Sequence, residues 1–415
     1  MVLLCLAHSS GGIRAVTSVV NSRLFFKTFR EAVVAFMFDF GGIIAGFIVA
    51  SNLNVFHYAS WAFAIYPAVI SAKGVIGGLF SGRLSTTLHI GTIHPRLFGN
   101  TKTFHKLYEA IILLTLVTSV AMCAVSMVFG SLIWGITLED FLNILVVVLA
   151  TMTLGLTISF LAIPISFMTF KRGLDPDVLV YPIMSTVADI GITSCYAIVL
   201  SLFFLFGDVG RYAVGFTGLF LVFLTLFILP RNIHDEDFAK TVRESLLTLV
   251  FVAFIVNITG TIMKSISAVA ENRREIYTVY PALIGLIGDV GSVIGSTATT
   301  KLALGLLKPS FTAIKSHATP ILAAWAASIA MFILASCISL VMNCVFELHV
   351  LFSFTSVLLA TNVMAVSAIV LVSYTISILT FRRGLDPDNF VIPIESSFAD
   401  STTSVALLIV LLLTG

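Results

Sequence analysis

The sequence predicts an all-α, polytopic membrane protein with about 11 transmembrane helices, arranged as two parallel five-helix repeats joined by a linker helix. Three observations predict this class. Of 415 residues, 58% are hydrophobic and only 11% are charged, against roughly 25% charged in a soluble domain. Apolar runs long enough to cross a bilayer recur along the chain, and one segment occurs twice. The same composition excludes a soluble or disordered chain, and a net charge of +2 argues against a nucleic-acid partner.

The elements follow in order from these runs. Residues 13–30 place Arg and Lys among aliphatic side chains, which predicts an amphipathic helix lying on the membrane surface, within an N-terminal segment 1–30. Eleven apolar runs come next, at roughly 32–52, 58–81, 107–134, 141–169, 179–206, 211–230, 245–263, 278–304, 319–343, 349–380 and 390–414. We therefore expect a first repeat at 31–206, a connecting transmembrane helix at 207–230 and a second repeat at 231–415. Five scattered cysteines form no CxxC pair, so neither a disulfide framework nor a zinc site is indicated.

The positive charges predict the orientation. Eighteen of the 23 Lys and Arg residues fall on the side of the predicted membrane where the N-terminus lies. Cytoplasmic loops are enriched in these residues. We expect an integral protein of the plasma membrane, with the N-terminus cytoplasmic and the C-terminus external.

The internal repeat predicts the architecture. Residues 169–183 read TFKRGLDPDVLVYPI and residues 380–394 read TFRRGLDPDNFVIPI, with 11 of 15 positions identical. The Tyr-Pro-Ala sequence at 66–68 likewise recurs at 280–282. Two five-helix units separated by one extra span have the same orientation, so a pseudo-two-fold axis runs along the membrane normal. We expect the functional path on or near this axis.

Ionisable residues inside the spans are the functional candidates, because burying charge in a bilayer is costly. There are six of them: Asp39, Lys73, Asp189, Asp289, Glu395 and Asp400. Only Asp189 and Asp400 occupy equivalent positions in the two repeats, and both fall near the membrane midplane at 1.5 Å per helical residue. This pair predicts a cation site. The alternative left open is that each Asp bonds a neighbouring Ser or Thr and only packs the bundle.

The remaining candidates break the symmetry. We expect Asp39 and Lys73 to neutralise each other, which gives Lys73 a structural role. Asp289 is predicted as a further cation ligand, and Glu395 and Asp39 as residues that line the path or its entrance. Two readings stay open for the repeated glycines, among them Gly74 and Gly288: close helix packing, or backbone carbonyls exposed to an ion path.

At this point the motifs show a resemblance. The segment KGVIGGLFSGRLSTTLHIG at 73–91 and the two GLDPD…P…AD segments at 173–189 and 384–400 resemble the membrane domain of MgtE magnesium transporters. The two-copy arrangement is similar to solute carrier family 41, and the resemblance covers nearly all of 31–415. It implies a transporter without cytoplasmic regulatory domains, with Mg²⁺ as the transported ion and Asp189 and Asp400 contacting the hydrated ion.

One departure from the family pattern bears on the site. The second helix of the family often carries Asn after the Gly, whereas this chain has Val75 and Asp289. The second repeat is therefore expected to be the stronger cation ligand.

The predicted function is Mg²⁺ transport through an acidic path on the pseudo-two-fold axis, driven by the electrochemical gradient, and not an enzymatic reaction. Expected partners are divalent cations and the lipid bilayer; fused repeats are compatible with a monomer, and a dimer stays open. The first alternative is a Na⁺- or H⁺-coupled exchanger that extrudes Mg²⁺. A remote alternative is an intramembrane aspartyl hydrolase, which needs two acids within hydrogen-bond distance.

Overall fold

The computed structural model describes residues 10–172, 176–232, 236–271, 273–311, 314, 317–383 and 388–414, and every regular element in them is a helix. The first half contains α2 (Ser10–Phe36), the 3₁₀ turn η2 (Met37–Phe40), α3 (Gly41–Ser51), α4 (Leu53–Phe56), α5 (Ser60–Ile90), α6 (Lys102–Phe129), the π-helical turn η3 (Gly130–Trp134), α7 (Leu138–Phe160), α8 (Ala162–Lys171) and α9 (Pro176–Leu205). The linker is α10 (Gly207–Asn232). The second half contains α11 (Glu236–Ala270), α12 (Arg274–Ala303), α13 (Ala318–Met342), α14 (Leu348–Arg382) and α15 (Asp388–Thr414).

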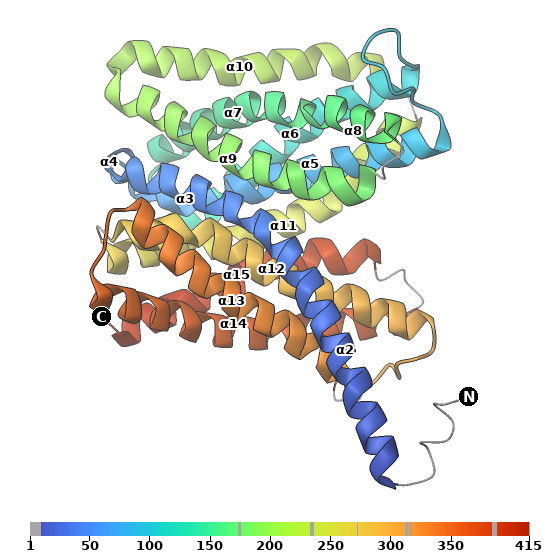
Figure 1. Cartoon of the computed structure of the whole chain (residues 1–415). Coiled ribbons are helices and arrows are strands. Elements are labelled where there is room, and N and C mark those ends of the chain that lie inside the picture. The colour runs from blue at the N-terminus through green and yellow to red at the C-terminus, as the bar shows by residue number, and fades with distance from the viewer. Residues whose placement is uncertain are drawn as a thin grey trace.

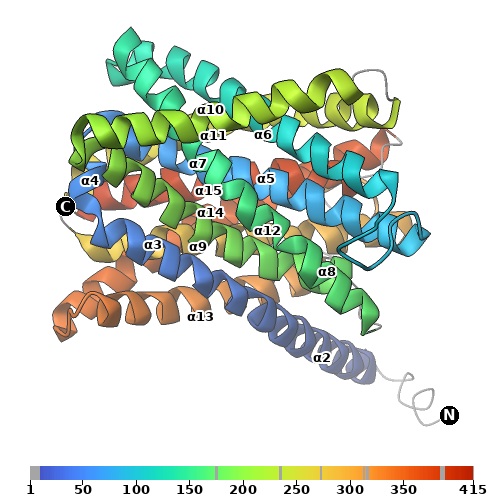
Figure 2. The ribbon, with the colours of Figure 1, turned by 90° about the horizontal axis from the view of Figure 1, so that it is seen from above.

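The long helices run side by side along one common direction, as Figures 1 and 2 show. Among the described residues, ten helical stretches are long and apolar enough to cross a membrane: Ser22–Ser51, Lys102–Trp134, Leu138–Lys171, Thr186–Leu205, Gly207–Asn232, Val252–Ala270, Arg274–Thr299, Ala318–Met342, Leu348–Leu379 and Ser397–Thr414. Helix α5 is not one of the ten, because its side chains are described only in part; it has 31 residues and lies within the bundle. The predicted class, an all-α polytopic membrane protein, is confirmed.

The first repeat begins with one continuous helix. The sequence predicts a surface helix at 13–30 followed by a separate span from about residue 32, whereas α2 runs through both from Ser10 to Phe36. No Gly or Pro lies between Arg30 and Phe36, so nothing in the sequence stops the helix there. The regular geometry changes only at η2, where Asp39 lies.

The two halves are interlocked by their first helices. In Figure 1 helices α5 to α10 fill the upper half and α12 to α15 the lower half, with α3 along the boundary and α2 running down across the lower half. Helix α3 packs on α12, and α2 packs on α13. In the same way, α11 packs on α5 and α6. The first helix of each repeat therefore lies against the second and third helices of the other repeat, which is the exchange that a pseudo-two-fold axis produces.

Two glycines make this crossing possible. A Cβ added to Gly46 of α3 would lie 2.1 Å from the carbonyl oxygen of Thr278 in α12. A Cβ added to Gly260 of α11 would lie 1.9 Å from the carbonyl oxygen of Ala64 in α5. Under the sequence repeat, Gly46 corresponds to Gly260 and Ala64 corresponds to Thr278, so the two contacts are equivalent. Only glycine lets the two backbones approach this closely, as at small-residue contacts between membrane helices.

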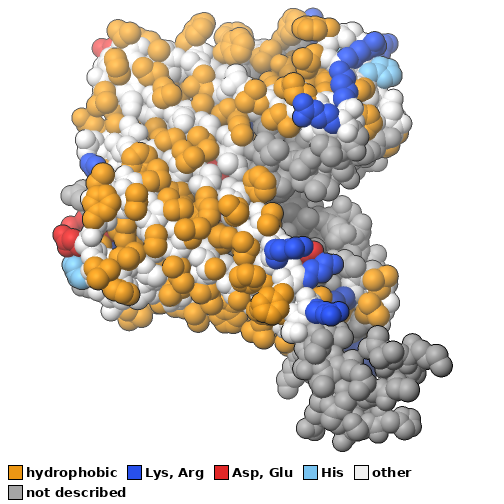
Figure 3. All heavy atoms as spheres, viewed as in Figure 1, with side chains coloured by type: hydrophobic (Ala, Val, Ile, Leu, Met, Phe, Trp, Pro, Cys, Tyr) orange, Lys and Arg blue, Asp and Glu red, His pale blue; other side chains and the backbone are white. Residues whose placement is uncertain are grey.

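On the face drawn in Figure 3, most charged side chains lie toward the ends of the molecule. Figure 3 shows hydrophobic side chains over the middle of the visible face, with Lys and Arg gathered at the end where α2 begins. A small buried cluster lies near this end, where α12 ends and α13 begins, around Leu302 and Tyr374. His317, the residue before α13, is fully buried, and its ring lies 6.1 Å from that of Tyr374. Burial, with Lys301 nearby, lowers the pKa of His317 to about 4.

Candidate functional site

The last helices of the two repeats, α9 and α15, carry the predicted acid pair. Asp189 and Asp400 are both partly buried and close enough to interact electrostatically, although no hydrogen bond joins them. Ser71 of α5 donates a hydrogen bond of 2.8 Å to Oδ2 of Asp400, so one repeat holds the carboxylate of the other. The structure thus brings the two equivalent acids to one place between the repeats. Their role as cation ligands stays a prediction.

Two tyrosines at equivalent positions of the repeats bond to the helices that carry this acid pair. The hydroxyl of Tyr66 in α5 forms a hydrogen bond of 3.1 Å with Thr193 of α9, and that of Tyr280 in α12 one of 2.8 Å with Ser404 of α15. Thr193 and Ser404 each lie four residues after the acid of their helix, on the same face. Both tyrosines belong to the Tyr-Pro-Ala sequence that recurs in the two repeats, and this recurrence was the signal in the sequence for a matched structural role.

A second acid pair lies beside the first. The carboxyl group of Asp39, in η2, lies within hydrogen-bonding distance of that of Asp289, in α12, and also interacts electrostatically with Asp189. Space for it comes from Gly285, because a Cβ there would lie 2.8 Å from Oδ1 of Asp39. Electrostatic interactions therefore link the four aspartates in the order Asp289, Asp39, Asp189 and Asp400, which we call the line of four aspartates.

The contacts of Lys73 differ from the predicted ion pair with Asp39. The lysine was expected to neutralise Asp39, but its ammonium group donates to the hydroxyl of Ser159 in α7. It is 1% exposed and lies near Cys195 of α9, on the opposite side of α5 from the acids. The rotation of α5 directs Lys73 into the packed interior of the first repeat, whereas Asp39 packs against the second. The pairing of Asp39 with Lys73 was therefore wrong.

The glycine candidates differ between the repeats. A Cβ at Gly288 would meet the Cβ of Ala399, the residue before Asp400, at an ordinary contact distance of 3.7 Å. A Cβ at the equivalent Gly74 would meet no atom within 4 Å. A methyl group would therefore fit at either position, so packing does not require glycine at Gly74 or Gly288, and both explanations of these glycines stay open. The side chain of Glu395 and both GLDPD loops lie outside the described residues.

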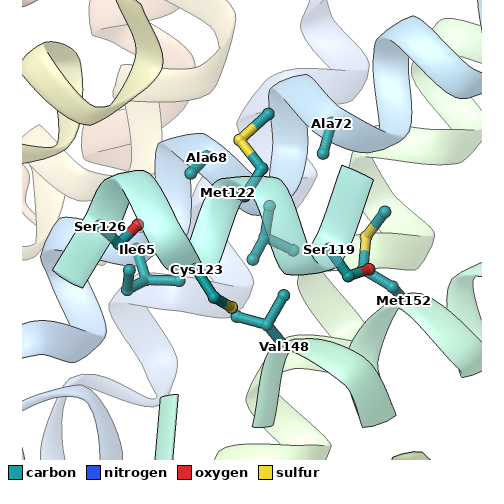
Figure 4. A pocket seen from close by; sticks show the side chains of 10 residues that line it. Ile65, Ala68, Ala72, Ser119, Met122, Cys123, Ser126, Val148 and Met152 are labelled. Carbon is teal, nitrogen blue, oxygen red and sulfur yellow. The ribbon is translucent and has the colours of Figure 1, made fainter. Parts of the chain in front are cut away.

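Neither a compact metal cage in the described residues nor a small apolar cavity offers another site. Among the described residues, no group of three or more His, Cys, Asp or Glu side chains is placed to hold a metal ion. Figure 4 shows a small cavity between α5, α6 and α7, where Ala68, Met122 and Val148 face one another. Its two serines already bond, Ser119 to a backbone carbonyl and Ser126 to Asn257. This apolar cavity is unsuited to a cation.

Fold and site together define a polytopic helical membrane protein with an acidic interior built between two pseudo-symmetric repeats, an arrangement suited to moving cations. The family model described as MgtE, a divalent cation transporter, matches residues 66–199 and 280–410. These regions cover more than half of the chain, one in each repeat, and the chain belongs to the MgtE family of divalent cation transporters. No curated protein and no solved structure gives a significant match. The family is one of transporters, not of enzymes.

Proposed function

We propose that this protein moves Mg²⁺ across the plasma membrane along the line of four aspartates, with Asp189 and Asp400 as the central contacts. The observation that carries the proposal is the placement of two equivalent carboxylates between the repeats, with Ser71 holding one across the boundary. Buried acids facing a helical interior, without a basic partner, are the arrangement that cation pathways use.

The composition of the site favours a largely hydrated ion. Mg²⁺ takes six oxygen ligands and gives up its water reluctantly, so it is held by one or two carboxylates more often than by an all-protein cage. A pair of acids without a three-residue cluster in the described part of the chain fits this chemistry. Mn²⁺, Co²⁺ and Ca²⁺ are the competing ions that a transport assay should include.

The driving force follows from charge. A divalent cation entering a negative cell gains about 4.6 kcal/mol per 100 mV, so uptake needs no coupling ion. We propose a cytoplasmic N-terminus and an external C-terminus, which the gathering of basic side chains near the start of α2 supports. Lys301, Lys308 and Arg382 are among the basic residues at that end.

Purified protein in liposomes with an Mg²⁺-sensitive dye inside tests this proposal. Asp189→Asn and Asp400→Asn should each reduce Mg²⁺ uptake at least tenfold, because each removes one charge from the acid pair between the repeats. Asp208→Asn is the matched control, since it makes the same change at an exposed position on α10. Full uptake by both site variants would refute the site. A flux that follows an imposed Na⁺ or pH gradient would instead establish the coupled exchanger.

The hydrolase alternative has one geometric point in its favour, because Asp39 and Asp289 do lie within hydrogen-bonding distance. We do not propose it, since the family is one of transporters.

A further inference from the structure

The pair of Asp39 and Asp289 has no counterpart on the other side of the pseudo-two-fold axis. The positions equivalent to them in the opposite repeats are Ala253 and Val75, both apolar. Asp39 comes from the first helix of repeat 1, and Asp289 from the second helix of repeat 2. The crossing of α3 over α12 is therefore what brings the two acids together.

The local geometry fixes Asp39 in place. The 3₁₀ turn η2 interrupts the first transmembrane helix at this residue, and a mid-helix stretch of 3₁₀ often marks a functional hinge or a strained sequence. Thr186 of α9 donates a hydrogen bond of 3.0 Å to the carbonyl of Phe38, which fixes the turn against the helix that carries Asp189. Gly285 leaves the space that the carboxyl group of Asp39 occupies. Two helices besides its own thus define the position of this side chain.

The pair lacks the partners that buried acids require. Oδ2 of Asp39 is buried and receives no hydrogen bond from any donor. None of the ion pairs in the described residues involves Asp39 or Asp289, and the buried Lys73 bonds to Ser159 instead. Two adjacent carboxylates in a low-dielectric interior repel each other and lose their hydration. Two positive charges between them would satisfy both, which a single divalent cation supplies.

We propose that Asp39 and Asp289 form a second divalent-cation subsite, at which the ion loses part of its water shell and binds both carboxylates directly. The inference rests on the proposed transport function and extends it. Asp189 and Asp400 hold the ion with its water, and the adjacent pair coordinates it by oxygen, the ligand type that Mg²⁺ and Mn²⁺ share. The subsite is built on one side of the axis only, so the two repeats play unequal parts.

Equilibrium binding of Mn²⁺ to the purified full-length chain in nanodiscs tests the subsite, with the free ion measured by electron paramagnetic resonance. Asp39→Asn should remove one bound Mn²⁺ or weaken it at least tenfold. The double variant Asp189→Asn with Asp400→Asn should keep an ion whose binding Asp39→Asn then abolishes. Unchanged Mn²⁺ binding in Asp39→Asn would overturn the proposal, because the pair would then be bridged by a proton alone.

A second variant guards against misfolding. Gly285→Ala leaves both charges in place but puts a methyl group 2.8 Å from Oδ1 of Asp39, so the carboxyl group must shift and Mn²⁺ binding should also weaken. Gly215→Ala is its control, since a Cβ there meets no atom within 4 Å. Wild-type binding in Gly285→Ala would contradict the geometry. Binding does not depend on transport, so the subsite can fail while Asp189 and Asp400 still control Mg²⁺ uptake, and the reverse can also be seen.

Discussion

At the scale of single residues, one-sided contacts decide what each buried charge does. Asp400 accepts a hydrogen bond from Ser71, whereas the position equivalent to Ser71 in the second repeat is Gly285, which has no side chain and admits Asp39. One substitution between the repeats thus converts a hydroxyl that supports one acid into room for another. The sequence repeat preserves Asp189 and Asp400, and the differences around them make their surroundings unequal.

Lys73 and Asp39 should behave as independent sites. Lys73→Met should leave thermal stability in detergent unchanged or raise it, because it replaces a buried ammonium group that has only a hydroxyl partner by an apolar chain of similar length. In a double-mutant cycle with Asp39→Asn, the coupling free energy should stay below about 0.5 kcal/mol. A coupling above about 1 kcal/mol would restore the ion pair that the sequence suggested.

At the scale of elements, the contacts between repeats depend on glycine. Gly46→Ala and Gly260→Ala should each destabilise the protein by about 1–3 kcal/mol or prevent assembly, since the new methyl group would overlap a carbonyl oxygen that cannot move aside. Thermal unfolding and the monodisperse fraction on size exclusion measure the effect. Gly215→Ala, in the exposed linker α10, should be neutral or slightly stabilising. Equal stability of all three variants would mean that the helices do not cross as closely as described.

The start of α13 should be sensitive to acid. His317 is buried as the neutral ring, with neither nitrogen bonded among the described residues, and its pKa is lowered to about 4. As pH falls below about 6.5, the unfolded chain takes up a proton that the folded chain refuses, so stability is lost between about 6.5 and 4. The loss is on the order of 1 kcal/mol at pH 5.5.

His317→Phe should abolish this part of the acid sensitivity, because a phenyl ring does not titrate. Thermal unfolding at pH 7.5 and pH 5.5 compares it with His349→Phe, the same change at an exposed position. An identical pH response in the two variants would show that His317 is not the titrating group.

At the scale of the whole molecule, the orientation of the protein in the membrane can be tested by cysteine labelling. Cys344 is exposed between α13 and α14, at the end opposite the basic side chains. With the proposed topology, a membrane-impermeant maleimide should label intact cells at Cys344, and Cys344→Ser should remove the label. In the Cys344→Ser background, a cysteine placed at Phe98, in the exposed loop between α5 and α6, should react only after the membrane is permeabilised. The opposite pattern would invert the protein.

Much of the fold was accessible from the sequence, because apolar length and charge placement respond to the bilayer alone. That Asp189 and Asp400 are equivalent positions was accessible too, since both recur in a repeated motif. The partners of Asp39 and Lys73 were not. Which way Lys73 points depends on the rotation of α5, and which acid meets Asp39 depends on the crossing of α3 over α12. A glycine in the sequence indicates close helix packing, but it does not indicate which helix packs against it.

The crossing of first helices has a consequence for biosynthesis. Helices α2 and α3 are synthesised first, but the helices on which they pack, α13 and α12, are synthesised only after the linker α10. Until then, α3 packs on α9 while its other side faces lipid, and α5 lacks its contact with α11. Neither repeat can finish folding as the ribosome releases it, and the chain closes as one unit near the end of translation. A truncation after α10 would leave the first half with one incoming helix missing and one helix of its own without its partner.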